Sequence, residues 1–221
     1  MAKKGPAGEV PANPETLRRI ANHIEQNVGE VSFVLDERDS SLVHIALQVV
    51  APTPEANFYT VITAGMSDRP MTAPPFAAPF KYAELLICLP PWWPMTMEAL
   101  AKDENYWPLA LLKKLARYPH RHNTWLFYGH TVPNGEPPRA LGRNTRMSAA
   151  ILSVPLLFGQ KLWKLIVSPE KEISFFSVIP IYAEERDFAM NNDSEGLLDL
   201  LNDNGVTELL DVGRRNECLK N

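Results

Sequence analysis

Residues 105–131 constrain the fold most, because they contain the clearest helix of the chain, its densest aromatic cluster and three of its five histidines. Apolar residues recur there at helical spacing, which predicts a helix that buries one stripe. The basic residues of the same helix lie on the opposite side and are expected to face solvent. The buried stripe is predicted to contain Leu111, Leu112, Leu115 and Tyr118.

Prolines set the expected limits of this helix. Pro108 suits the first turn, where a missing N–H costs nothing, and Asp103 or Asn105 can cap the free amides ahead of it. Pro119 predicts the end of the helix, because proline interrupts the helical hydrogen bonds. The aromatic and β-branched residues that follow predict a strand over residues 124–128.

The rest of the chain predicts an α+β fold, a mixed α/β sandwich in which a mixed, largely antiparallel sheet packs against helices. Residues 1–12 lack periodicity and predict a flexible N-terminal tail, whereas residues 13–221 predict a single domain. Further helices are expected over 14–28, 183–190, 195–201 and 206–212. Apolar patterns predict strands over 31–35, 42–50, 58–63, 82–89, 149–154, 162–167 and 173–179.

Composition narrows the class of protein. The net charge of −4 lacks the broad positive field that non-specific nucleic-acid binding needs, so no nucleic-acid partner is expected. Two cysteines form no disulfide framework. Because no signal peptide and no membrane-spanning apolar run is visible, we expect a cytoplasmic protein without a membrane partner. The sequence predicts no cofactor.

Three histidines, His120, His122 and His130, suggest an enzyme as an alternative. Imidazole is the commonest zinc ligand, and a small hydrolase or metal-dependent enzyme would use this turn together with Asp68. The spacing does not support a metal site, since no HExxH motif and no nearby second cysteine accompany the histidines. Hydrogen bonds to backbone groups at the end of the helix are the simpler expectation.

Ser67 follows a predicted strand and invites comparison with a nucleophile turn. Such a turn needs Gly-x-Ser-x-Gly, whereas the position two residues after Ser67 is Arg69. Gly65 is expected to make the chain turn sharply here. We therefore expect Ser67 and Asp68 to bond to their own backbone amides as a turn or cap.

The aromatic residues near the centre of the chain have two possible roles. Buried, they fill the core, which is the simpler expectation; exposed together, they form a binding surface for a protein or peptide. A third hypothesis joins basic side chains into a nucleic-acid patch, with Lys113, Lys114, Arg117, Arg121 and the arginines of the loop at 133–146. The aromatic residues are Trp92, Trp93, Tyr106, Trp107, Trp125, Phe127 and Tyr128.

Five motifs, taken in order, resemble the suppressor of fused family in its compact bacterial form. They are GMSDRPM, YAELLICLP, YWPLALLKKLARYPHRHNTWLFYGHT, ISFFSVIPIYAEER and GVTELLDVGRRN. The resemblance spans roughly residues 32–216 and implies a mixed α/β domain without catalytic activity. In animals, the family protein holds a transcription factor through a peptide that adds as a strand in a cleft between two domains.

The animal protein is a negative regulator of Hedgehog signalling. This chain resembles only the first of its two domains, so that role is not expected here. The resemblance instead implies a non-enzymatic protein-interaction domain that binds and masks a protein or peptide partner, as a bacterial immunity or regulatory protein. Asp68, Arg69, Arg117 and Arg214 are expected to form a polar network or a partner surface. The full set of motif residues is Gly65, Met66, Ser67, Asp68, Arg69, Trp107, Pro108, Leu115, Ala116, Arg117, Tyr118, Asp211, Arg214 and Arg215.

Overall fold

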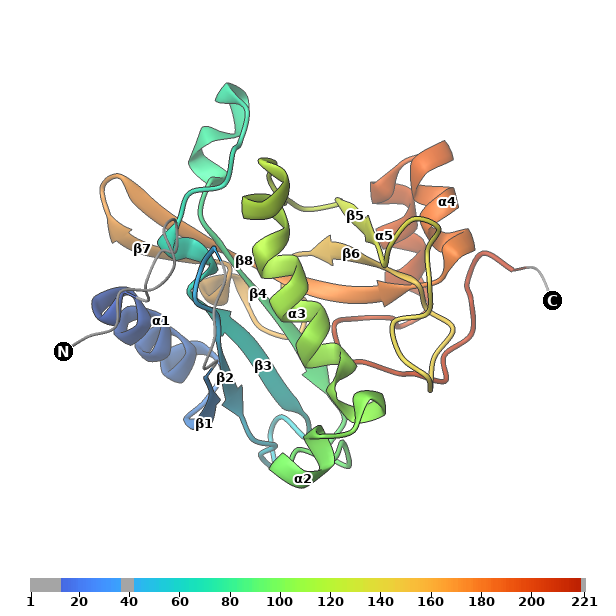
Figure 1. The fold of residues 1–221 in the computed structure, drawn as a ribbon, viewed down its shortest axis with the longest axis horizontal. Helices are drawn as coiled ribbons and strands as arrows, with labels where there is room; N and C mark the ends of the chain where they lie inside the picture. The colour runs from blue at the N-terminus through green and yellow to red at the C-terminus, as the bar shows by residue number, and fades with distance from the viewer. Residues whose placement is uncertain (1–12, 37–41, 220–221) are drawn as a thin grey trace.

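A computed structural model describes residues 13–36 and 42–219 (Figure 1), so the predicted tail at residues 1–12 lies outside the described part. Its centre is one sheet of eight strands in the order β1-β2-β3-β4-β8-β6-β5, with β7 paired to β8. Within the described part, β4 and β8 pair in parallel and the other neighbours pair antiparallel. The strands are β1 (Val31–Leu35), β2 (Ala46–Val50), β3 (Tyr59–Ala64), β4 (Ala83–Leu89), β5 (Thr131–Pro133), β6 (Ala149–Ser153), β7 (Lys164–Ser168) and β8 (Lys171–Ile181).

Helices cover both faces of the sheet. The described helices are α1 (Pro14–Asn27), α2 (Met97–Leu100), α3 (Asp103–His122), α4 (Ala183–Asn191) and α5 (Ser194–Asp203), with short 3₁₀ turns η1 (Met66–Asp68), η2 (Pro75–Phe80) and η3 (Gln160–Leu162). Figure 1 shows α3 crossing the sheet, α1 beside β1 and β7, and α4 with α5 near β6. The α+β prediction, with a mixed and largely antiparallel sheet, is confirmed.

The alternation of strand residues explains these layers. Val49 packs with the leucines of α3, whereas its neighbour Val50 packs with Ile20 and Ile24 of α1. Because successive strand side chains point to opposite faces, a strand with both faces covered is apolar throughout. All seven residues of β4 are accordingly buried, and six of them are apolar, Glu84 being the exception.

Helix α3 is longer than the prolines predicted. It begins at Asp103 after the cap residue Lys102, so Pro108 lies inside the helix rather than in its first turn. Pro108 cannot donate to the carbonyl of Glu104, and the side-chain amide of Asn144 donates to that oxygen instead, at 3.2 Å. The prediction that Pro119 ends the helix is also wrong. The helix continues to His122 and stops at Asn123, whose backbone is left-handed with φ of 50°.

The predicted strand at 124–128 does not form. This segment is held instead by isolated hydrogen bonds to the residues before η2. In one of them, the N–H of Thr72 donates to the carbonyl of Thr124 at 3.0 Å. The predicted helix at 206–212 is also wrong, since this segment is extended and Leu209 forms a parallel bridge with Cys88. The N–H of Cys88 and that of Leu210 make the two flanking bonds, so the segment extends the sheet beside the end of β4.

The aromatic residues near the centre of the chain are mostly core. Trp93 and Trp107 are buried and meet edge to face, with ring centroids 6.4 Å apart. Trp125 and Phe127 are half-buried and stack on each other. Trp92 is the exception, because 69% of its surface is exposed.

Candidate functional site

The turn after β3 is fixed by its glycine. Gly65 has φ of 121°, and a Cβ at this position would overlap the carbonyl oxygen of His44. Only glycine accepts both the positive φ and the close approach of that backbone. The predicted sharp turn is therefore confirmed, and it directs Met66, Ser67 and Asp68 into the short turn η1.

Glu84 of β4 holds this turn in place, a role that the sequence motifs did not predict. One carboxylate oxygen, Oε1, accepts from the N–H of Gly65 and of Ser67, both at 3.0 Å, and from the hydroxyl of Ser67 at 2.7 Å. The other, Oε2, accepts from the hydroxyl of Thr63 at 2.6 Å. Complete burial raises the pKa of Glu84 to about 7, although these four hydrogen bonds act in the opposite direction.

Asp68 joins the same turn to two other elements. Its carboxylate accepts from the backbone N–H of Asn13, the cap residue of α1, at 2.9 Å. The ammonium of Lys171 in β8 lies 3.9 Å from the other carboxylate oxygen. Burial raises the pKa of Asp68 and lowers that of Lys171. Asp68 therefore ties α1 and β8 to η1.

Ser67 is not placed as a nucleophile. It is fully buried, and its hydroxyl donates to Glu84 rather than to a histidine. The expected bonds of Ser67 and Asp68 to their own backbone amides are also not the ones observed. The bonds to Glu84 and from Asn13 replace them, since the turn is surrounded by neighbouring elements instead of solvent.

The three histidines point to different neighbours. His120 is buried and its Nε2 lies 3.1 Å from the carbonyl oxygen of Met66, and burial lowers its pKa. His122 meets Tyr118 at a tilt, with ring centroids 4.5 Å apart, and His130 meets Trp125 edge-on at 4.8 Å. In the part of the chain that the structure describes, no group of three or more metal-ligating side chains lies together.

A second polar cluster holds the C-terminal segment. The two terminal guanidinium nitrogens of Arg214 each lie 2.6 Å from a carboxylate oxygen of Glu185, which is fully buried. Arg214 also donates to the carbonyl of Pro180 at 3.0 Å and covers the ring of Tyr182 at 5.0 Å. Asp211 accepts from the N–H of Gly213 at 2.8 Å and shapes the turn before Arg214. These residues join the C-terminal segment to the end of β8, and we call them the C-terminal staple.

The motif residues of α3 lie apart from both clusters. The indole N–H of Trp107 donates to the side-chain oxygen of Asn144 at 3.0 Å, and Arg117 is buried, with a contact to the carbonyl of Lys113 at 3.4 Å. Arg69 is half-buried beside His120 and helps to lower the pKa of that histidine. The structure thus divides the nine predicted site residues among the η1 turn, α3 and the C-terminal staple. It does not bring them into one site.

Strand β5 forms one end of the sheet path, where it pairs with β6. The N–H of Leu152 donates to the carbonyl of His130, and the N–H of Asn134 donates to Ser148, so alternate residues of this segment bond towards β6. Thr131 and Pro133 therefore direct their backbone groups away from β6. Pro133 has no N–H to offer at this edge.

Two surface hollows flank β5. One of about 370 Å³ lies between the segment 124–132 and the helices α4 and α5, and includes His130 and Met190. The other, of about 330 Å³, lies between α3 and the segment after β5, and includes Arg121 and Pro133. Tyr118 lines both hollows, which places this motif residue next to the open edge of the sheet.

Comparisons with known proteins identify the family. The family model described as suppressor of fused protein matches residues 41–215 of the chain. The chain belongs to the suppressor of fused family. No curated protein sequence gives a significant match. The match confirms the resemblance that the five sequence motifs indicated.

Solved structures agree on the fold. A suppressor of fused homolog from Neisseria gonorrhoeae has a TM-score of 0.67 at 16% identity, with 95% of this chain and all of that chain covered. A chain of the Sufu–Fu complex gives a TM-score of 0.63 at 16% identity, covering 92% and 93%. Drosophila Suppressor of Fused gives 0.57 at 16% identity, but this chain covers only 47% of that protein's length. Among the described residues, no helix is long and apolar enough to cross a membrane.

Proposed function

We propose that this protein is a non-enzymatic interaction domain that binds and masks a segment of a protein partner along the open edge of β5. The single observation that carries the proposal is the position of β5 at the end of the sheet, with Thr131 directed outward between two hollows. An extended segment paired with an open edge gains affinity from backbone hydrogen bonds, and neighbouring pockets select its side chains. Membership of the family and the similarity to a chain of the Sufu–Fu complex support binding to a protein.

The polar clusters support a structural scaffold rather than a reaction centre. Glu84 and Glu185 are fully buried with their carboxylates bonded to protein groups, and the hydroxyl of Ser67 is directed to Glu84. A catalytic base must instead reach a substrate proton. We therefore propose that no catalysis takes place and that the complex with the partner is stoichiometric, with no cofactor, nucleic acid or membrane involved.

For its biological setting, we propose a cytoplasmic immunity or regulatory role in a bacterium. The two free cysteines, of which Cys88 is fully buried, support a reducing compartment. The similarity to the Neisseria homolog supports a bacterial context. Immunity and regulation both require a partner to be masked, and the identity of that partner distinguishes them.

The test is affinity capture with variants at one position of the open edge. Thr131→Pro removes the outward N–H, whereas Thr131→Ala keeps it and serves as the matched control. We expect the original protein and Thr131→Ala to capture one partner in a fixed ratio, and Thr131→Pro to lose it while its thermal unfolding stays close to that of Thr131→Ala. Equal capture by both variants would refute binding along this edge.

A further inference from the structure

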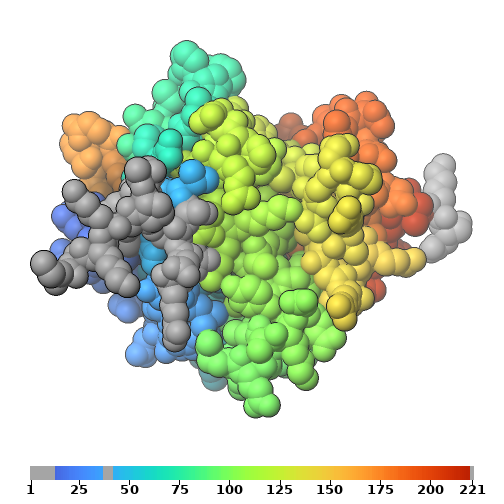
Figure 2. All heavy atoms as spheres, viewed as in Figure 1, coloured from blue at the N-terminus to red at the C-terminus, as the bar shows by residue number. Residues whose placement is uncertain are grey.

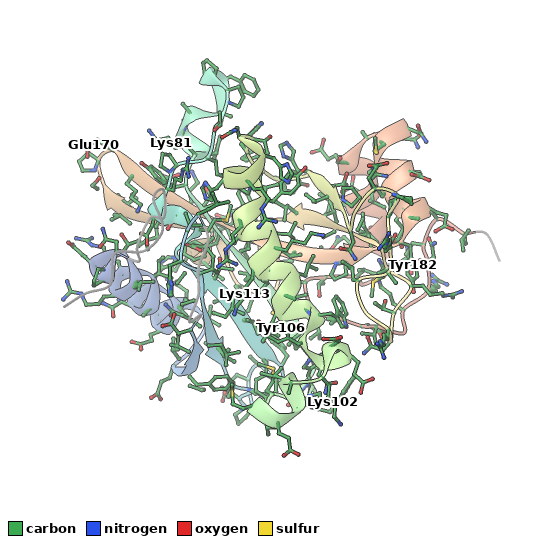
Figure 3. All side chains as sticks on the ribbon, viewed as in Figure 1. Lys81, Lys102, Tyr106, Lys113, Glu170 and Tyr182 are labelled. Atoms are coloured by element: carbon green, nitrogen blue, oxygen red, sulfur yellow. The ribbon has the colours of Figure 1, made fainter. Side chains whose placement is uncertain are left out.

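A further surface hollow, separate from the two that flank β5, lies beside the first turns of α3. We call it the α3 groove, and its volume is about 560 Å³. The half-buried Tyr106 and Leu141 form its apolar floor, with the buried Trp107 beneath, and the exposed Arg139 and Arg143 form its rim. Figure 2 shows the green atoms of α3 beside the yellow atoms of the loop before β6, and Figure 3 labels Tyr106 on the helix.

The groove is preformed, because hydrogen bonds fix the loop that forms its rim. Asn144 accepts from the indole of Trp107 and donates to the carbonyl of Glu104, which joins the loop to α3. The side chain of Asn134 donates to the carbonyls of Arg139 and Ala140, at 3.1 and 3.0 Å. The backbone of Arg139 is thereby held in place, because its N–H also donates to the carbonyl of Asn134 at 3.0 Å.

Gly142 shows how closely the loop packs on the floor of the groove. A Cβ at this position would overlap the indole ring of Trp107. The glycine therefore lets the loop pack directly on the tryptophan, which is buried beneath it. A rigid, preformed site loses less conformational entropy when it binds.

The charges of the rim indicate the chemistry of the occupant. Arg139 and Arg143 are exposed, and neither has an ion-pair partner among residues 13–36 and 42–219. Asp103 is the one acidic residue that lines the groove, so two cations face one carboxylate there. The adjoining hollow is balanced, because Lys102 and Arg143 face Asp103 and Glu104. The groove is thus locally basic on a chain with a net charge of −4.

We infer that the α3 groove binds an acidic peptide segment of the partner, in which an apolar side chain lies next to an Asp or Glu. The apolar side chain would pack on Tyr106 and Leu141, and the carboxylate would bond to Arg139 or Arg143, whose planar guanidinium groups suit carboxylates. This inference rests on the proposed function and adds a second contact that selects the partner. Two linked contacts raise affinity beyond either contact alone.

The probe is a linear peptide selected from a phage-displayed library on the immobilised full chain, labelled with fluorescein and titrated by fluorescence anisotropy. We expect selection of peptides with an apolar residue beside Asp or Glu. The double variant Arg139→Gln/Arg143→Gln should weaken their binding about tenfold or more. The control Arg18→Gln/Arg19→Gln, at exposed positions of α1, should change it less than about twofold.

Three results would overturn the inference: no enrichment of such peptides, equal binding by the rim double variant, or displacement of the peptide by an oligouridylate at lower concentration than by free acidic peptide. The Thr131→Pro variant separates this inference from the proposed function. If Thr131→Pro loses the partner while the rim variant keeps it, the edge of β5 binds and the groove does not. If the peptide binds the groove in both Thr131 variants, the groove acts independently of that edge.

Discussion

The hydroxyl of Ser67 lies 2.7 Å from Oε1 of Glu84, and the N–H of the same serine lies 3.0 Å from that oxygen. The buried carboxylate of Glu84 on β4 thereby holds the turn that follows β3. The contact explains why a serine stands at the turn: its side chain and its backbone both donate to Glu84. It also removes the serine from consideration as a nucleophile.

Replacing Glu84 should destabilise the protein strongly. In Glu84→Leu, the N–H groups of Gly65 and Ser67 lose their acceptor in a buried place, which costs about 3 kcal/mol in the free energy of unfolding. Urea unfolding measures this loss. Glu98→Leu, at an exposed position of α2, is the control and should shift the free energy by less than about 0.5 kcal/mol. A small effect of Glu84→Leu would show that the turn does not depend on the carboxylate.

The pKa of Glu84 makes part of the stability depend on pH. Because burial raises this pKa from 4.5 to about 7, the folded protein retains a proton between these values that the unfolded chain releases. The stabilisation is complete below the lower value and is lost as pH rises towards 7, by roughly 3 kcal/mol. Buried His23 and His120 and half-buried His130 oppose this trend, because their lowered pKa values favour the folded state at higher pH.

The difference between two pH profiles isolates the contribution of Glu84. We expect the unfolding free energy of the original protein, minus that of Glu84→Gln, to fall between pH 4.5 and 7, since glutamine does not titrate and the histidine contributions cancel. Urea unfolding at several pH values provides the data. A flat or rising difference across that range contradicts a raised pKa.

The Glu185–Arg214 pair gives a second stability prediction. Removing one member of a buried ion pair leaves the other uncompensated, so Arg214→Met should lower the free energy of unfolding by about 3 to 5 kcal/mol. Arg215→Met is the matched control at the next residue, where the side chain is 66% exposed, and should have little effect. Chemical denaturation of both variants decides the matter. Equal effects would mean that the staple does not stabilise the C-terminal segment.

Two glycines contrast a position that excludes a Cβ with one that accepts it. Gly65→Ala should lower stability by more than about 3 kcal/mol, because its φ of 121° and the carbonyl of His44 both exclude a Cβ. Gly159→Ala should change stability by less than about 0.5 kcal/mol, since nothing lies within 4 Å of a Cβ there. Thermal unfolding of the two proteins compares them. A Gly65→Ala protein as stable as the original would disprove the turn geometry.

Much of the fold follows from local patterns in the sequence. The seven predicted strands 31–35 to 173–179 correspond to observed strands, because their apolar residues need burial on one or both faces of a sheet. The prediction failed where tertiary contacts override local preference. Residues 124–128 have strand-forming side chains, but their backbone bonds to the segment before η2 and their aromatic rings pack against other rings.

The end of α3 shows the same limit. Pro119 disfavours a helix at that position, yet the bond between His120 and the carbonyl of Met66 joins the last turn to η1. A contact between residues so far apart in sequence leaves no trace in local periodicity. The cap that replaces the missing bond of Pro108 likewise comes from the distant Asn144.

The candidate sites were less predictable than the fold. Glu84 was missed although a signal existed, since a lone carboxylate in an otherwise apolar strand is expected to have a dedicated partner. The α3 groove leaves no such signal, because it depends on a loop and a helix that are separated in sequence. The motif residues Asp68 and Arg214 each lie in a polar network, and both networks join parts of the same chain.

Hydrogen–deuterium exchange at the open edge of β5, measured with and without the captured partner, tests the central claim most directly. Binding along that edge should slow exchange at the amide of Thr131, because its outward N–H would donate to the added segment. Strand β1, at the opposite end of the sheet, should keep its exchange rates and serves as the internal control. If the partner binds in a fixed ratio while the Thr131 amide exchanges as fast as before, the edge of β5 is not the binding site.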